Sequence, residues 1–204
     1  GPKLVPNDEI IAACFGFSVS LSSDGNTAII GGNIDNGGFG AAWIFTRKNG
    51  VWNQTQKLVG TGAVGNPNQG SSVAISGDGN TCVVGGCQDN IVPGNSNGNG
   101  AIWIFTKSGG IWSQQGSKLV GTESSNNALQ GYSVAISYDG NTVITGGVSD
   151  YPDGAAWVFS RSNGVWSQQG SKSRAPRRPE RHGGAPEQSH CGAPLGPRGC
   201  RSPT

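Results

Sequence analysis

The feature that most constrains the fold is a sequence pattern that occurs three times along the chain. Segments with the form Gly-x-Ser-Val-x-x-Ser-x-Asp-Gly-Asn-Thr begin at Gly16, Gly70 and Gly131, so their starts are 54 and 61 residues apart. Repeats of this length are typical of architectures in which one small unit stacks on its neighbours. We therefore expect three tandem copies of a single structural unit.

Each copy contains four segments with the properties of β-strands. The first reads Ser-Val-Ala-Ile-Ser at 72–76, and the Asp-Gly-Asn after it predicts a tight hairpin turn with glycine at positive φ. The second is short and apolar, as at 27–30, and ends in two glycines. The third is Ala-Ala-Trp-Ile-Phe at 41–45, and the fourth runs from Val51 to about Val59. The pattern predicts an all-β chain with one four-stranded antiparallel sheet per copy.

The polarity of the strands predicts how the sheets pack. The first three strands are almost continuously apolar, so both of their faces should be covered, whereas the fourth alternates as a solvent-facing edge strand does. This gradient is typical of a β-propeller blade, whose inner strands lie between neighbouring blades. We expect the blades at 3–56, 57–117 and 118–172.

Several motifs resemble the FG-GAP repeat. They are Phe15-Gly16 followed by Ser18-Val19, the Gly-Gly pair after the second strand, and Gly40-Ala41-Ala42-Trp43-Ile44-Phe45. The resemblance covers residues 3–172, although the other copies have Gln69-Gly70 and Gln130-Gly131 in place of Phe-Gly. It implies the propeller architecture of integrin α-chains and many bacterial surface proteins, and a secreted or cell-surface location.

Calcium binding is a further property of many FG-GAP blades, through a loop with several acidic residues. The matching turns here contain one carboxylate each, from Asp24, Asp78 and Asp139. Calcium takes six to eight oxygen ligands, usually including several carboxylates. We therefore interpret these aspartates as turn formers, and we expect no metal and no cofactor.

Three blades are fewer than the four to eight of a closed propeller. An open row would leave two apolar faces in water, which favours association. Lys3-Leu4-Val5 repeats the closing half of a fourth strand, and Val165 to Lys172 repeats an opening half. Either the chain is a fragment, or two or three copies close a ring as a homo-oligomer, which is the partner that we expect.

The two ends of the chain lie outside the repeat. Gly1-Pro2 is typical of the residues left when a protease removes a tag. Residues 173–204 form a basic tail rich in Pro, Gly and Arg, which we expect to be disordered. A single-base insertion after the Lys172 codon would turn Leu-Val into Ser-Arg, so the tail is interpreted as a frameshifted fourth repeat. The alternative, a nucleic-acid-binding or membrane-binding arm, is disfavoured because the tail has no aromatic residue.

The residues needed for catalysis are missing from the repeats. Both histidines, His182 and His190, belong to the tail, and no paired carboxylates, nucleophile elbow or phosphate-binding loop recur. We therefore expect no enzyme and name no catalytic residue. No apolar run is long enough to span a membrane, and no nucleic-acid partner is expected.

Polar loops and exposed aromatics are the candidates for binding. The loops after the second strands and the tryptophans of the fourth strands supply the candidate ligand-binding residues, which are Asp35, Asn36, Asp89, Asn90, Asp150, Tyr151, Trp52, Trp112 and Trp166. Such loops on a propeller rim can hold a glycan or a cell-surface protein. The first hypothesis is therefore a multivalent binding or adhesion module. The second is a structural propeller that assembles into rings or filaments and has no small ligand.

Overall fold

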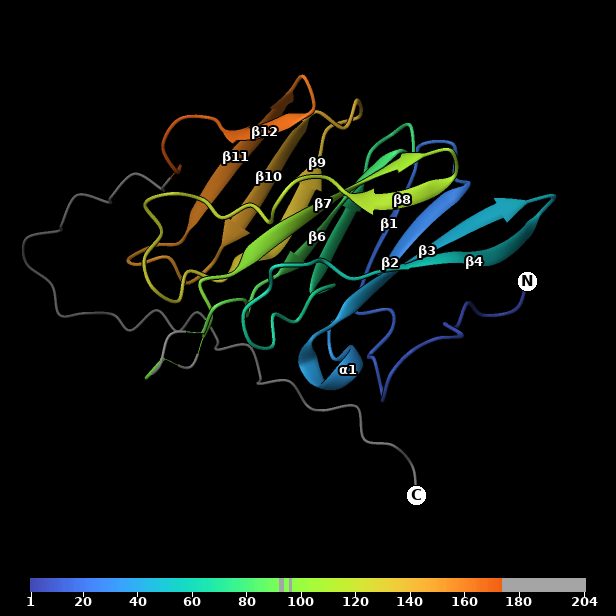
Figure 1. The fold of residues 1–204 in the computed structure, drawn as a ribbon, viewed down its shortest axis with the longest axis horizontal. Helices are drawn as coiled ribbons and strands as arrows, with labels where there is room; N and C mark the ends of the chain where they lie inside the picture. The colour runs from blue at the N-terminus through green and yellow to red at the C-terminus, as the bar shows by residue number, and fades with distance from the viewer. Residues whose placement is uncertain (92–93, 96, 174–204) are drawn as a thin grey trace, which may run out of the picture.

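The computed structural model describes residues 1–91, 94–95 and 97–173. The described residues form three four-stranded antiparallel sheets that follow one another in chain order (Figure 1). The predicted tail lies outside this range, apart from Ser173. One short helix, α1 (Asp35–Gly38), occurs in this part of the chain. None of these residues form a helix of the length and hydropathy needed to span a bilayer.

Each sheet has its strands in sequence order, and we refer to the sheets as blades 1, 2 and 3. Blade 1 consists of β1 (Ser18–Leu21), β2 (Thr27–Gly32), β3 (Ala41–Lys48) and β4 (Val51–Leu58). Blade 2 consists of β5 (Ser72–Ile75), β6 (Thr81–Gly86), β7 (Ala101–Ser108) and β8 (Ile111–Gln114). Blade 3 consists of β9 (Gln130–Ile136), β10 (Thr142–Gly147), β11 (Ala155–Ser162) and β12 (Val165–Gln168).

The Asp-Gly-Asn turns explain why the first two strands of each blade pair in the same register. In blade 1 the Ser22 hydroxyl donates a 2.6 Å hydrogen bond to Asp24, and the backbone N–H of Asn26 donates to the same carboxylate at 2.9 Å. Gly25 has a φ of 67°, which glycine adopts without the steric cost of a Cβ. The same side-chain bonds recur in blades 2 and 3. The local sequence therefore fixes the hairpin and, with it, the pairing of the two strands.

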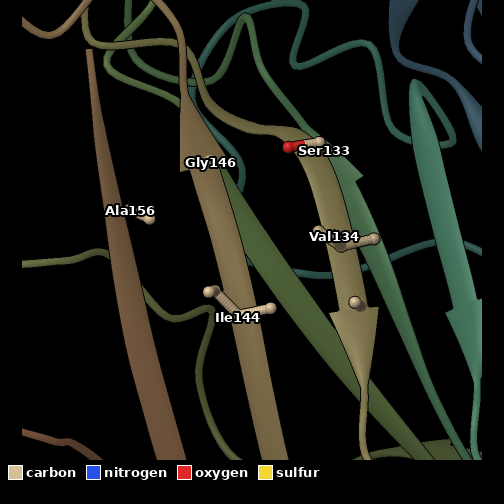
Figure 2. Close-up of a pocket in the computed structure, with 6 residues that line it drawn as sticks. Ser133, Val134, Ile144, Gly146 and Ala156 are labelled. Carbon is tan, nitrogen blue, oxygen red and sulfur yellow. The ribbon is translucent and has the colours of Figure 1, made fainter. Parts of the chain in front are cut away.

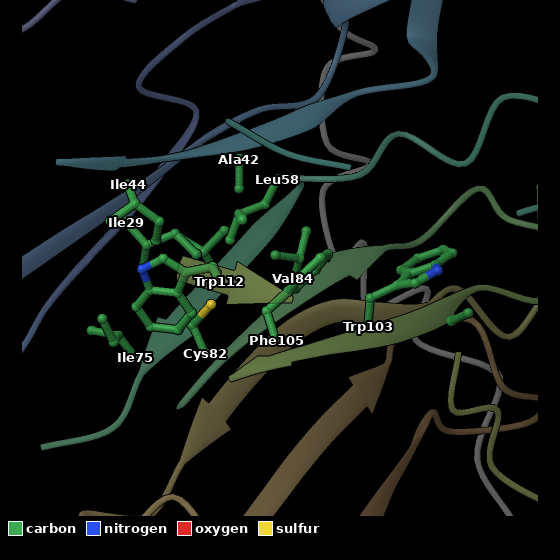
Figure 3. Packing of buried hydrophobic residues seen from close by; sticks show 12 residues of the cluster. Ile29, Ala42, Ile44, Leu58, Ile75, Cys82, Val84, Trp103, Phe105 and Trp112 are labelled. Atoms are coloured by element: carbon green, nitrogen blue, oxygen red, sulfur yellow. The ribbon is translucent and has the colours of Figure 1, made fainter. Parts of the chain in front are cut away.

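The hydrophobic core lies between the blades. One buried cluster joins Ile29, Ile44 and Leu58 of blade 1 to blade 2 residues that include Val84 and Trp103 (Figure 3). A second cluster joins blade 2 to blade 3, with Val83 and Ile104 on one side and Val143, Trp157 and Phe159 on the other. The prediction of propeller blades stacked through apolar faces is confirmed, because blade 2 is covered on both sides.

The outer faces of blades 1 and 3 are only partly covered. Val19 and Leu21 of β1 are 68% and 55% exposed, whereas the matching Val73 and Ile75 of blade 2 are buried. On blade 3, Ile144 is 44% exposed, although its counterparts Ile29 and Val83 are fully buried. None of the buried clusters in the described residues joins blade 1 to blade 3.

The N-terminal segment covers the peripheral half of the outer face of blade 1. Leu4, Ala13 and Phe15 pack against a buried cluster that includes Trp43 and Phe45. Phe15 makes an edge-on contact with the Trp43 ring at 5.5 Å between centroids. On blade 2 the corresponding position is taken by the end of β4, where Leu58 packs in the cluster that contains Trp103. The N-terminal segment takes this position on blade 1.

Candidate binding surface at the loop end of the blades

The blades have two different ends. At the loop end lie the connections between the second and third strands, together with the linkers that enter each blade. At the turn end lie the Asp-Gly-Asn turns and the hairpins between the third and fourth strands. The candidate residues from the loops lie at the first end, and the candidate tryptophans lie at the second.

At the loop end, each blade contains one buried aspartate, and Asp35, Asp89 and Asp150 are at most 2% exposed. Each of them forms an ion pair with a lysine of its own blade, near the end of the fourth strand. These pairs are Lys57–Asp35 at 2.7 Å, Lys118–Asp89, and Lys172–Asp150 at 2.6 Å. A buried charge is tolerated when it is paired in this way.

The second oxygen of each carboxylate binds the linker that enters the blade. The backbone N–H groups of Ile10, Val64 and Ser125 donate to Asp35, Asp89 and Asp150 at 2.6, 2.8 and 2.6 Å. The residue after each aspartate returns a bond, since the N–H groups of Asn36, Asn90 and Tyr151 donate to Ile10, Val64 and Ser125. Each aspartate therefore holds the loop, the linker and the outer strand together.

A buried tryptophan completes the cluster in each blade. The indole N–H groups of Trp43, Trp103 and Trp157 each donate a 2.8 Å bond to the entering linker, to Asp8, Thr61 and Thr122 respectively. The ammonium groups of Lys57 and Lys172 lie 5.1 and 5.9 Å from the ring centres of Trp43 and Trp157. At this range the ring quadrupole attracts the cation.

Three of the candidate residues face solvent at the loop end. Asn36, Asn90 and Tyr151 are exposed, and Tyr151 is 78% accessible. Asn36 and Asn90 adopt φ values of 52° and 58°, in the left-handed region that asparagine tolerates. Because the aspartates are occupied by their ion pairs, a ligand at this end would contact the residues that follow them.

The tryptophans of the fourth strands lie at the other end and differ in exposure. Trp112 is 4% exposed within the core between blades 1 and 2, and its backbone exchanges two hydrogen bonds with Gln56. Trp52 and Trp166 are half-buried beneath Arg47 and Arg161, whose guanidinium carbons lie 5.5 and 5.3 Å from the ring centres. Trp52 and Lys57 are five positions apart along β4, or roughly 17 Å. The structure therefore does not bring the loop residues and these tryptophans into one small site.

Hydrogen bonding shifts the pKa values of several carboxyl groups. The Ser22 hydroxyl, the Asn26 backbone and the Asn26 side chain lower the pKa of Asp24 to about 2. Burial raises the pKa of the Asp150 carboxyl, but the bonds from Lys172 and Ser125 outweigh it and hold this pKa below its usual range. Both groups are therefore ionised at neutral pH.

The turns do not fit a calcium ion. Each supplies a single carboxylate, and both oxygens of Asp24 already accept hydrogen bonds from its own turn. Asp78 and Asp139 are held in the same way. Among the described residues, no group of three or more His, Cys, Asp or Glu side chains is placed to hold a metal.

The lysines are the part of this site that sequence reasoning missed. Lys57 and Asp35 are 22 residues apart, and no local pattern connects them. The available signal is that each copy contains a Lys near the end of the fourth strand and an Asp three residues after the Gly-Gly pair. Two opposite charges that recur once per copy, in an otherwise weakly charged repeat, indicate a pair.

Comparison with known families fits this geometry. Residues 52–105 match the family described as FG-GAP repeat. Residues 52–105 carry an FG-GAP repeat. The matched segment runs from the outer strand of blade 1 to the third strand of blade 2, and the other two copies share its motifs. No curated protein matches the sequence.

Two solved structures are similar to this chain in fold. A protein from Bacteroides fragilis NCTC 9343 assigned as a 6-phosphogluconolactonase is similar with a TM-score of 0.52 and 16% identity, over 76% of this chain and 38% of that one. A protein with the same assignment from Bacteroides uniformis ATCC 8492 gives 0.52 and 15%, over 76% and 39%. The chain thus spans about two fifths of the length of these propeller-type proteins. At such identity the likeness concerns the fold alone.

Proposed function

We propose that this β-propeller module is a non-enzymatic binding or adhesion protein, secreted or displayed at the cell surface, that contacts a glycan or a protein through the loop end of its blades. The observation that carries the proposal is that each blade holds one exposed side chain on the same kind of buried support, an asparagine in blades 1 and 2 and a tyrosine in blade 3. Asn36, Asn90 and Tyr151 follow the paired aspartates. Their N–H groups donate to the entering linkers, to the carbonyl oxygens of Ile10 and Val64 and to the hydroxyl of Ser125.

A rigid support that presents one exposed residue per blade suits multivalent recognition. The aspartate and the tryptophan are buried and the aspartate is paired with a lysine, so the backbone of each loop is fixed before any ligand arrives. Preorganisation of this kind reduces the entropy lost on binding. Three weak contacts on one body can raise the overall affinity by about 10²–10⁴ over that of one contact.

A glycan array probed with the full chain tests this proposal. The variant Asn36→Gly/Asn90→Gly/Tyr151→Ala removes the three side chains, and glycine suits the left-handed φ at the two asparagines. Binding should fall by about 100-fold or more in this variant. Tyr138→Ala is the matched control, because Tyr138 is 72% exposed but lies at the turn end. A blank array would exclude a glycan as the ligand, and binding that the triple variant retains would refute the role of the loop end.

The second candidate is a structural role in which blades assemble with other copies and no small ligand exists. The partly uncovered outer faces of blades 1 and 3 favour it, because apolar side chains such as Val19, Leu21 and Ile144 are exposed there.

A further inference from the structure

The chain makes the same contact between successive blades twice. The Ser18 hydroxyl of blade 1 donates to the carbonyl oxygen of Gly70 at 2.8 Å, and the Ser72 hydroxyl of blade 2 donates to that of Gly131 at 2.7 Å. Each serine is paired across its hairpin with a glycine, Gly31 or Gly85, on which a Cβ would clash with the same carbonyl. Each junction thus has a donor side and an acceptor side.

A second bond repeats at the turn end of each junction. The N–H of Ser23 donates to the carbonyl oxygen of Gly77 at 3.1 Å, and the N–H of Gly77 donates to that of Tyr138 at 2.9 Å. These three residues each precede the Asp of an Asp-Gly-Asn turn. The bonds therefore run in one direction along the row, from each blade to the next.

The outer face of blade 3 presents the donor side of such a junction. Ser133 is exposed and lies opposite Gly146, as Ser72 lies opposite Gly85. Together with Ile144 and Ala156 they line a shallow hollow of about 210 Å³ (Figure 2). A Cβ on Gly146 would approach only Ser133, whereas on blades 1 and 2 the carbonyl of the next blade fills this place.

The outer face of blade 1 presents the acceptor side. Gly16 is exposed and has a φ of 92°, close to the 84° and 81° of Gly70 and Gly131. Val19 and Leu21 lie beside it. In blades 2 and 3, the side chains at the same two positions pack in the clusters between blades. The two outer faces of this chain are therefore the two halves of a junction that it already forms twice.

We propose that the outer face of blade 3 docks on the outer face of blade 1 of a second copy of this chain, head to tail. In this contact the Ser133 hydroxyl donates to the carbonyl oxygen of Gly16, and the Tyr138 N–H donates to that of Ser23. Two copies joined at both faces contain six blades, within the range of closed propellers. The inference rests on the second candidate function and is independent of any ligand at the loop end.

The contact requires one exchange of chain segments. In blade 3 the N–H and carbonyl groups of Ser173 pair with Ala156 at 2.8 and 3.0 Å, as Leu119 pairs with Ile102 in blade 2. In the second copy, Leu4 packs against blade 1 in the way that Leu119 packs against blade 3. Ser173 and Leu4 would meet at the same place, so Leu4 replaces Ser173 beside Ala156 and completes the outer strand of blade 3.

Sedimentation equilibrium of the full chain across a concentration series tests the proposal. The wild-type mass should rise from 20.8 kDa towards twice that value. Val19→Asp and Ile144→Asp each place a charge in the junction and should weaken association by about 100-fold or more. Val165→Asp is the matched control, because Val165 is 69% exposed on the outer strand and should leave association unchanged.

A mixture of the two face variants distinguishes a head-to-tail contact from contacts between identical faces. The Val19→Asp chain keeps an intact blade 3 face, and the Ile144→Asp chain keeps an intact blade 1 face. An equimolar mixture should therefore form a two-chain species that neither variant forms alone. A wild-type chain that stays at 20.8 kDa, an equal effect of Val165→Asp, or a mixture that stays monomeric would each overturn the proposal. None of these readouts depends on the glycan array.

Discussion

Replacement of Lys172 by methionine tests the energetic role of the buried ion pairs. Lys172 and Asp150 are the least exposed pair, with side chains 4% and 0% accessible and a separation of 2.6 Å. Methionine keeps an unbranched apolar chain against Trp157 but removes the charge. The carboxylate would keep the bond from the Ser125 N–H and lose its cation.

The expected loss is large because the carboxylate stays buried. Removal of one partner of a buried pair destabilises a protein by about 3–5 kcal/mol, against a total of roughly 5–15 kcal/mol. With a urea slope of about 2 kcal/mol per molar, the unfolding midpoint should fall by about 2 M. In Lys172→Met/Asp150→Asn, which has no buried charge and keeps an acceptor for Ser125, about half of this loss should be recovered.

The pH dependence of this loss has a defined sign. In the wild type the pKa of Asp150 is lowered, so its contribution is present above the unfolded pKa of about 3.9 and is lost as the pH falls through the folded value. Without Lys172, burial is less opposed and raises the pKa of Asp150. The variant therefore loses most stability at neutral pH. Its difference from wild type in the free energy of unfolding should be smaller at pH 4.

Urea unfolding followed by tryptophan fluorescence at pH 7 and pH 4 measures both effects. Lys48→Met serves as the control, since this lysine is exposed at the end of β3 and its loss should change stability by less than about 0.5 kcal/mol. A midpoint shift below about 0.3 M at pH 7, or a shift that grows at pH 4, would refute the reasoning.

Three further predictions concern other parts of the blades. Gly85→Ala places a Cβ against the carbonyl of Gly131 and should lower the free energy of unfolding in urea by about 1–3 kcal/mol. An unchanged free energy would show that the contact between the blades is not tight. Asp24 should titrate near pH 2 by NMR, so that its contribution is lost only as the pH falls through that value, and a midpoint near 3.8 would contradict its bond from Ser22. Burial raises the pKa of the Cys82 thiol, which should resist alkylation in the native chain and react after denaturation; peptide mapping that finds native Cys82 modified would argue against its burial.

The fold could be predicted from sequence because its main signals are local. Asp24 and Asn26 form the hairpin turn within five residues, and the apolar stretch at 27–30 becomes the wholly buried β2. The loops that carry Asp35, Asp89 and Asp150 lie at one end of the sheets, because the connection between the second and third strands of an antiparallel sheet leaves from the end opposite the first hairpin.

The chemistry of the candidate site was harder to predict because it depends on non-local contacts. The pairing of Lys57 with Asp35 needs three strands to form before the two charges meet. Trp52, Trp112 and Trp166 occupy the same place in their repeats, yet only Trp112 lies in the core, where the Gln56 side chain bonds its backbone. Val19 and Val73 also occupy the same place, and only Val73 is buried, because only blade 2 of these two has a preceding blade to pack against. The repeat pattern does not encode the position of a blade in the row.

The offset between the family repeat and the folded sheet has a consequence for how such chains lengthen. A repeat that starts on an outer strand and finishes on the third strand of the following blade spans a junction. Duplication of such a segment adds a sheet together with the surfaces that pack it against its neighbour. A chain that gains whole repeats in this way therefore needs no newly evolved contact. Evolution can then adjust the number of blades independently of the residues that hold any two of them together.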